Sequence, residues 1–169
     1  EHDLHSVADF SRFDPEAKTW TALTPMPEAR STHDAVVIGR TIYVAGGWHM
    51  KGVDEESEFL KSALAFNLDK PEDGWKSIPQ PFQRRALSVA SREGKIYVLG
   101  GLVGGGMTVD RNVDIYDPAT GTWSQGPALG GGGRTEGFGT SAFEVAGRIY
   151  YSGSSGRIFR RNDAGDAWE

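Results

Sequence analysis

The sequence predicts an all-β protein built from repeated antiparallel sheets, and three observations lead to that prediction. Short segments rich in β-branched and aromatic residues alternate with turn residues along a chain of 169 residues. The 23 glycines and 8 prolines supply the many tight turns that short strands require. Sets of aromatic residues recur at intervals of about 50 residues, a period typical of repeat architectures. Together these features predict a single domain, residues 1–169, made of repeated β units.

The repeat consists of three series that run in phase. Strand-like segments that end in glycine form the first series: 41–47 (Thr-Ile-Tyr-Val-Ala-Gly-Gly), 95–101 (Lys-Ile-Tyr-Val-Leu-Gly-Gly) and 148–154 (Arg-Ile-Tyr-Tyr-Ser-Gly-Ser). Tryptophans form the second: Trp20, Trp75, Trp123 and Trp168. Arginines that open each unit form the third: Arg30, Arg84 with Arg85, and Arg134. Three series that recur with the same spacing are improbable by chance. The units are therefore expected to fold alike.

Each unit is predicted to contain two hairpins. The first hairpins carry glycine in their turns: 36–44 with Gly39, 88–98 with Gly94, and 143–150 with Gly147. Glycine tolerates the positive φ that such turns need, because it has no Cβ. A second hairpin is predicted in 117–123, where Pro118 sets the first turn angle and Gly121 the left-handed one. Each unit is therefore predicted to form a four-stranded antiparallel meander.

The order of features within a unit is the most specific signal. An arginine-bearing turn precedes a strand, a short turn, a strand ending in Gly-Gly, a loop, a strand ending in aromatic-Asp-Pro, a turn and tryptophan. This order resembles the kelch repeat over essentially the whole chain. The resemblance implies a β-propeller, whose four-stranded blades pack face to face around a channel. Blades are expected at 27–80 and 81–128, with a partial blade at 5–26 and a degenerate one at 129–169.

The expected blades amount to about three and a half, whereas closed propellers usually have about 4–8. An open arc leaves blade faces bare and favours association. Either the chain is a piece of a longer propeller, or two copies close one ring, and we expect a homo-oligomer, most simply a dimer. The Gly-Gly pairs are expected to let neighbouring blades approach closely, and the tryptophans to fill the space between blades.

Composition excludes several classes of function. The formal net charge of −5 argues against a nucleic-acid partner, and no apolar run is long enough to predict a membrane span. The absence of cysteine excludes disulfides and thiolate chemistry, including the copper–cysteinyl-tyrosine chemistry of the galactose oxidase class of kelch proteins. No cofactor is expected. The compartment stays open, with a bacterial periplasmic or secreted location among the expectations.

The candidate site is expected on one face of the propeller. Loops that link the outermost strand of a blade to the innermost strand of the next share a face with loops between second and third strands. The first set is 24–33, 79–87 and 127–138, and the second is 47–60, 101–112 and 153–157. These loops are longer than the turns on the opposite face, and long loops on a rigid scaffold are where binding residues concentrate.

The repeated arginines are the first candidates for ligand binding on this face. Projecting toward the channel mouth, they would form a ring of guanidinium groups suited to a carboxylate or sulfate, and hence to a protein partner or an anionic glycan. The alternative is structural: they bind backbone carbonyls or acidic neighbours between blades. The four arginines are Arg30, Arg84, Arg85 and Arg134.

An aromatic side chain among polar groups is the second candidate. Trp48 and His49, with His33 from another loop, would suit stacking against a sugar. Two histidines in separate loops are a weak metal signal, and the acidic stretch 54–58 matches no known calcium loop, so no metal site is assigned. The glycine runs 104–106 and 130–133 lack the context of a phosphate loop and are predicted to be loop tips.

The sequence therefore favours a non-enzymatic binding or scaffolding propeller, and no catalytic residue is assigned. Two alternatives stay open. One is a partial propeller, natural or engineered, whose interest is structural assembly. The other is an isomerase of the sialic-acid mutarotase type, in which the arginines and histidines would be chemically suitable for an acidic sugar. That alternative rests on analogy, because a fold does not determine a function.

Overall fold

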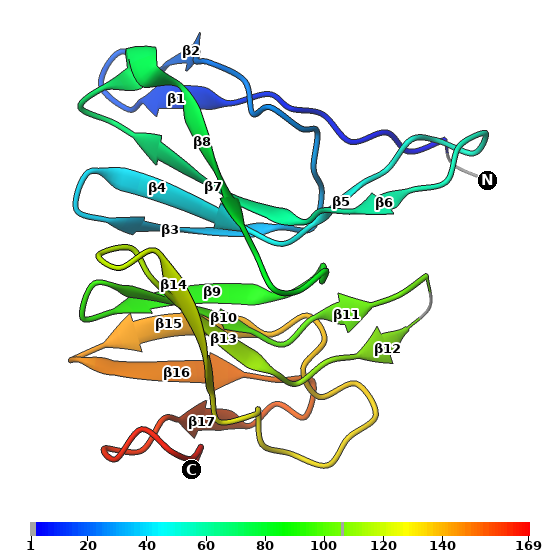
Figure 1. The fold of residues 1–169 in the computed structure, drawn as a ribbon, viewed down its shortest axis with the longest axis vertical. Coiled ribbons are helices and arrows are strands. Elements are labelled where there is room, and N and C mark those ends of the chain that lie inside the picture. Colours follow the sequence, from blue (N-terminus) through cyan, green and yellow to red (C-terminus); the bar gives the residue numbers. More distant parts are fainter. Residues whose placement is uncertain (1–2, 106) are drawn as a thin grey trace.

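The protein is an open arc of antiparallel sheets (Figure 1). The computed structural model describes residues 3–105 and 107–169. Apart from one short 3-10 helix, η1 (Pro71–Asp73), the regular elements are strands. The strands are β1 (Ser11–Asp14), β2 (Thr19–Ala22), β3 (Asp34–Ile38), β4 (Thr41–Ala45), β5 (Trp48–His49), β6 (Glu58–Phe59), β7 (Ser62–Asn67), β8 (Trp75–Pro79), β9 (Ser88–Arg92), β10 (Lys95–Leu99), β11 (Leu102–Val103), β12 (Thr108–Val109), β13 (Val113–Asp117), β14 (Thr122–Gly126), β15 (Ser141–Val145), β16 (Arg148–Ser152) and β17 (Ile158–Arg160).

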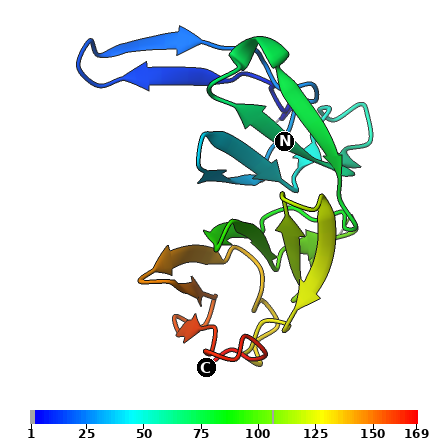
Figure 2. The same ribbon diagram turned by 60° about the vertical axis from the view of Figure 1, so that its left-hand side comes forward.

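Four successive sheets form the blades. The first contains β1 and β2, the second runs β3–β4–β7–β8, the third runs β9–β10–β13–β14, and the fourth runs β15–β16–β17. The strands β3, β9 and β15 stand at the edges of their sheets, and β9 packs against both of the others. Figure 2 shows the resulting arc, open on one side. The predicted all-β fold of kelch-type blades is confirmed, whereas a ring closed by a second copy is outside what a single chain shows.

The hairpin registers match the repeat in the sequence. Tyr43 pairs with Val36, Tyr97 with Ala90 and Tyr150 with Phe143 across the first hairpin of the three blades. In two of these turns both central residues have positive φ, as in a type I′ turn: Glu93 (53°) with Gly94 (73°), and Ala146 (51°) with Gly147 (76°). Positive φ was predicted for the glycines alone, but in these two turns the twist of the strands also requires it of the residue before.

The Gly-Gly pairs lie where one blade touches the next, as predicted. A Cβ on Gly46 would come within 2.8 Å of the Arg84 carbonyl oxygen and 2.4 Å of a Leu87 methyl group. A Cβ on Gly100 would come within 2.4 Å of the Gly137 carbonyl oxygen. Both glycines also have positive φ, at 68° and 62°. A side chain at either position would therefore strain the backbone and push neighbouring blades apart.

Three of the four repeated tryptophans fasten the outer edges of neighbouring blades. Each donates its indole N–H to a backbone carbonyl that belongs to the preceding blade or to the loop after it. Trp75 donates to Thr24 (3.0 Å), Trp123 to Pro79 (2.9 Å) and Trp168 to Pro127 (2.9 Å). Trp20 is the exception, since it lies at the end of the arc, is 70% exposed and contacts Phe13 of its own hairpin.

Replacing Trp123 with Phe should lower the free energy of unfolding by about 1–2 kcal/mol, because the Pro79 carbonyl loses its donor. Trp20→Phe is the matched control and should change it by less than about 0.5 kcal/mol, since among the described residues that indole donates to no carbonyl. Urea denaturation of both variants gives the comparison. Equal losses in the two would show that the indole hydrogen bond does not fasten the blades.

Candidate functional site

Two hairpins project from the blades on the same side of the molecule (Figure 1). The first is formed by β5 and β6, and the second by β11 and β12. Both connect the second and third strands of their blades. The loop 129–138, which leads into the last blade, lies beside the second hairpin, since Arg111 donates to its Gly131 and Gly133 carbonyls. We call this side the hairpin face, and it is the face that the loop lengths predicted.

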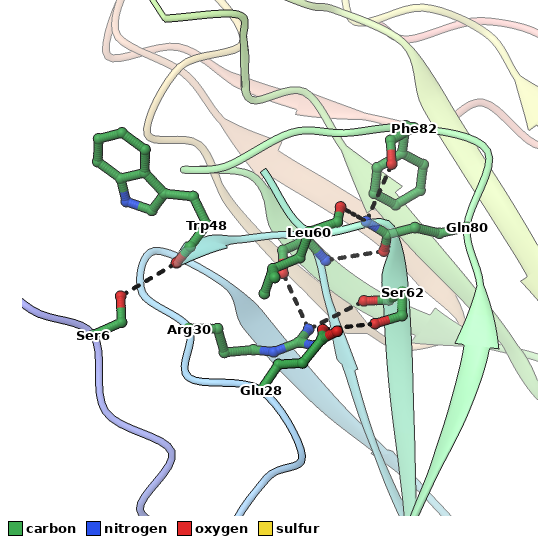
Figure 3. Close-up of polar contacts among 9 residues, drawn as sticks. Ser6, Glu28, Arg30, Trp48, Leu60, Ser62, Gln80 and Phe82 are labelled. Carbon is green, nitrogen blue, oxygen red and sulfur yellow. Dashed lines mark hydrogen bonds and ion pairs between the residues drawn. The ribbon is translucent and has the colours of Figure 1, made fainter. Parts of the chain in front are cut away.

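Arg30 lies inside its blade, with 3% of its surface exposed (Figure 3). Its Nη1 donates to the carbonyls of Gly46 and Ser62, both at 3.2 Å. Its Nη2 lies 3.6 Å from the Glu28 carboxylate, which in turn accepts a hydrogen bond from the Ser62 hydroxyl. Burial lowers the pKa of the guanidinium to about 10, against the opposing charge of Glu28. The Arg30 guanidinium thus joins the second and third strands of the blade, and we call this arrangement the arginine clamp.

Arg84 repeats this arrangement in the next blade, with none of its surface exposed. It donates to the Asn112 carbonyl at 2.7 Å, pairs with the Asp114 carboxylate, and lies 3.6 Å from Asp110. Burial raises the pKa of the Asp114 carboxyl, although the neighbouring guanidinium opposes that rise. Arg30 and Arg84 therefore occupy the structural role that the sequence analysis weighed as the alternative, and their guanidinium groups are not available at the surface.

Arg85 and Trp48 form a contact between blades. The Arg85 guanidinium carbon lies 4.3 Å from the centre of the Trp48 ring, a cation–π geometry. Trp48 also packs against Phe59 of its own hairpin, with ring centres 5.9 Å apart. The two predicted site residues thus lie together at the base of the first hairpin. This pairing joins different repeats, so the pattern within one repeat could not reveal it.

The two predicted histidines have different surroundings. His33 is half-buried near Gly47, and burial together with the charge of Arg30 lowers its pKa. His49 lies in β5 and pairs across the hairpin with Glu58. Within 3–105 and 107–169, no group of three or more His, Asp or Glu side chains could hold a metal ion. The structure brings neither histidine into a recognisable catalytic or metal-binding cluster there.

Arg134 is not the counterpart of Arg30 and Arg84, so that alignment is corrected. Gly47 donates its N–H to the Arg84 carbonyl at 2.8 Å, and Gly101 donates in the same way to the Gly137 carbonyl at 2.7 Å. Gly137 therefore stands at the arginine position of the last blade. Arg134 lies three residues earlier, exposed on the glycine-rich loop. The glycine run 130–133 lies where a recognisable residue pattern would be needed to align the last blade with the two before it, so the sequence alone did not identify position 137.

Two residues of this region were missed by the sequence analysis. Arg111 donates to three backbone carbonyls of the loop, those of Gly131 (2.8 Å), Gly133 (2.9 Å) and Glu136 (3.2 Å). Glu136 is wholly buried. Nothing in the local sequence marks either role, because each depends on a loop that folds back onto the second hairpin.

Two hollows have no residue of the hairpins β5–β6 and β11–β12 in their lining. One of about 420 Å³ is lined by the turns of the first hairpins, including Gly39, Arg92, Glu93 and Gly147. The other, of about 270 Å³, lies beside β1 among apolar and polar side chains. It is lined by Val7, Asp9, Phe10, Met26, Arg30, His33, Ala35, Ile42, Val44 and Trp75. Neither hollow contains an arrangement that defines a reaction.

Repeated four-stranded sheets, glycine contacts between blades and hairpins on one face define the chain as a segment of a β-propeller. A family profile described as Kelch motif matches residues 29–80 and 83–130. The chain belongs to the kelch-repeat family. In the described part of the chain, no helix is long and apolar enough to cross a membrane.

The comparisons also find relatives among known proteins. The chain is 32% identical to mouse Kelch-like protein 35 over 127 residues, which is 75% of this chain and 20% of the relative. It is 30% identical to human Kelch repeat and BTB domain-containing protein 12 over 129 residues, 70% of this chain and 20% of the relative. The matched region is thus about a fifth of the length of these relatives.

Replacing Arg84 with Met should lower the free energy of unfolding by about 3–5 kcal/mol, because the buried Asp114 carboxylate loses its partner. Arg134→Met is the matched control on the exposed loop and should stay within about 0.5 kcal/mol of the wild type. Guanidinium chloride unfolding of the three proteins measures both values. A loss at Arg84 no larger than that at Arg134 would contradict the clamp role.

Proposed function

We propose that this chain is a protein-binding propeller segment and that its partner docks on the hairpin face. The observation that carries the proposal is the projection of two hairpins, β5–β6 and β11–β12, from neighbouring blades on one side of the arc. They stand on sheets fixed to one another by the Gly-Gly contacts, so they offer a rigid, paired surface. Rigid scaffolds that present loops in this way are a common design for recognition.

The chemistry of the hairpin face suits a protein surface. Val53 and Met107, each near the end of one hairpin, are largely exposed. The first hairpin also carries acidic residues in 54–58, where Glu58 pairs with Lys51 at 2.8 Å. Protein interfaces combine an apolar centre with a polar rim, and in the proposed contact these residues supply both. The membership in the kelch-repeat family supports the same function.

We also propose that further blades cover both ends of the arc, and that in the isolated chain a second copy supplies them. Among the described residues β1 pairs only with β2, so its other edge is free. Trp20 and Phe13 are exposed at this end, and Phe143, Val145 and Ile158 at the other. Free strand edges and apolar surface favour association. Within a longer chain, neighbouring blades would take the same places.

Capture of proteins by the immobilised chain tests the docking face. Proteins bound by the wild type and identified by mass spectrometry should be lost from Met107→Asp and Val53→Asp, because a charge is placed in the contact. Val37→Asp is the matched control, since Val37 is also exposed but lies on β3, beside the turns of the first hairpins.

For a purified partner, the hairpin variants should weaken binding at least about tenfold, which is about 1.4 kcal/mol. Equal binding by the hairpin variants and the control would place the partner elsewhere and overturn the proposed face.

The mass in solution tests closure by a second copy. Light scattering on a sizing column should give twice the 18.3 kDa of the chain. Dilution should shift the mass toward the monomer, as mass action requires. A monomer at all concentrations would overturn self-closure and leave the docking face unaffected.

A further inference from the structure

The last blade lacks the arginine clamp of the two blades before it. Gly137 holds the position of Arg84, because its carbonyl accepts the same backbone hydrogen bond from the preceding blade. The carbonyls that receive a guanidinium in the other blades are nevertheless present. Strand β16 is followed by Gly153 as β4 is followed by Gly46, and Gly153 donates to the Arg157 carbonyl as Gly100 donates to that of Asn112.

These correspondences define what the missing side chain would have bound. Arg30 donates to the Gly46 and Ser62 carbonyls, and Arg84 donates to that of Asn112. The counterparts in the last blade are the carbonyls of Gly153 and Arg157. Among residues 3–105 and 107–169, no side chain donates to either of them.

A buried carboxylate lies against Gly153. Glu136 has no exposed surface, and within the described chain neither of its carboxylate oxygens has a hydrogen-bond partner. A Cβ on Gly153 would come within 1.6 Å of Glu136 Oε1, so the carboxylate occupies space that only glycine leaves free. The charge of Glu136 also acts, after burial, to raise the pKa of the Tyr151 hydroxyl to about 12. A buried carboxylate without a donor is unfavourable until a cation or donor reaches it.

We propose that Glu136, with the carbonyls of Gly153 and Arg157, forms a guanidinium slot that receives an arginine side chain of the partner protein. A guanidinium has five N–H donors, enough for both carboxylate oxygens and the two carbonyls. The same blade position holds a guanidinium in both preceding blades, which favours arginine over lysine or a metal ion. The slot rests on the proposed function, because it lies on the hairpin face.

The Glu136 side chain lies between Gly131 and Gly153, since a Cβ on either glycine would come within 2.6 Å of one of its atoms. Nearby, the hydroxyls of Thr135 and Ser154 join the two loops through a hydrogen bond of 2.8 Å. Arg111 holds the carbonyls of the loop from the outside, so the loop keeps its anchor when the Thr135–Ser154 contact opens. Entry of a partner side chain therefore requires the Thr135–Ser154 contact to open, while the Arg111 hydrogen bonds hold the rest of the loop.

Titration with Nα-acetyl-arginine amide, followed by ¹H–¹⁵N NMR, tests the slot. The amide signals of Gly137 and Gly153 should shift and saturate, and the neutral analogue Nα-acetyl-citrulline amide should leave them unchanged. Glu136→Gln should weaken arginine binding at least tenfold. Glu144→Gln, the matched loss of an exposed carboxylate in the same blade, should leave the affinity as it is.

Three results would overturn the slot. They are the absence of saturable shifts, equal shifts with citrulline, and equal affinity in Glu136→Gln and the wild type. The citrulline comparison uses the wild type, so it stands even where the variant fails to fold. Binding seen only in Arg134→Ala would show that the loop's own arginine fills the slot, which would also overturn a partner origin.

The experiments can reject the slot and the docking face independently of one another. Partner capture that is lost in Met107→Asp but unchanged in Glu136→Gln would remove the slot and keep the face. Capture that is unchanged in both would remove the face itself. A partner that binds through both should be weakened by each variant.

Discussion

The arrangement of the blades depends on one close contact, in which a glycine after the second strand of a blade touches the loop leading into the next. The Gly46 and Gly100 positions leave no room for a Cβ against the Arg84 and Gly137 carbonyls. The next glycine in each pair, Gly47 or Gly101, donates its N–H to the same carbonyl. Backbone therefore packs on backbone, with a spacing that no side chain could reproduce.

The relative positions of the two hairpins on the hairpin face depend on that contact. The glycine contacts fix the blades near the hairpins, and the indole hydrogen bonds of the outer strands fix them a second time. With two points of attachment, neighbouring blades keep one orientation, and so do β5–β6 and β11–β12. The arginine clamp is a third attachment, inside each of the two complete blades. Where Gly137 replaces it, the blade keeps its fold, because the backbone contact is still made, and the Gly153 carbonyl accepts the Gly156 N–H instead of a guanidinium.

Much of the fold could be predicted from the sequence because it depends on short-range patterns. Strand alternation and turn glycines act within one unit, and the recurrence of Tyr43, Tyr97 and Tyr150 shows that the unit repeats. The site could be predicted only in part. The stack of Arg85 on Trp48 joins two repeats, and the burial of Glu136 depends on Gly153 across the blade. Such contacts depend on how units dock, which no single repeat encodes.

Trp20 and Trp123 show what the neighbour contributes. Both follow an Asp-Pro turn at the start of an outer strand, yet Trp20 is exposed and Trp123 donates across a blade boundary. The two tryptophans differ because only Trp123 has a preceding blade to contact. The free energy of unfolding of a repeat protein is approximately the sum of the contributions of the single repeats and of the interfaces between neighbours. A blade at the end of the arc lacks the contribution of one interface. Any chain segment that supplies the missing contact therefore stabilises the end blade and binds it in the same step.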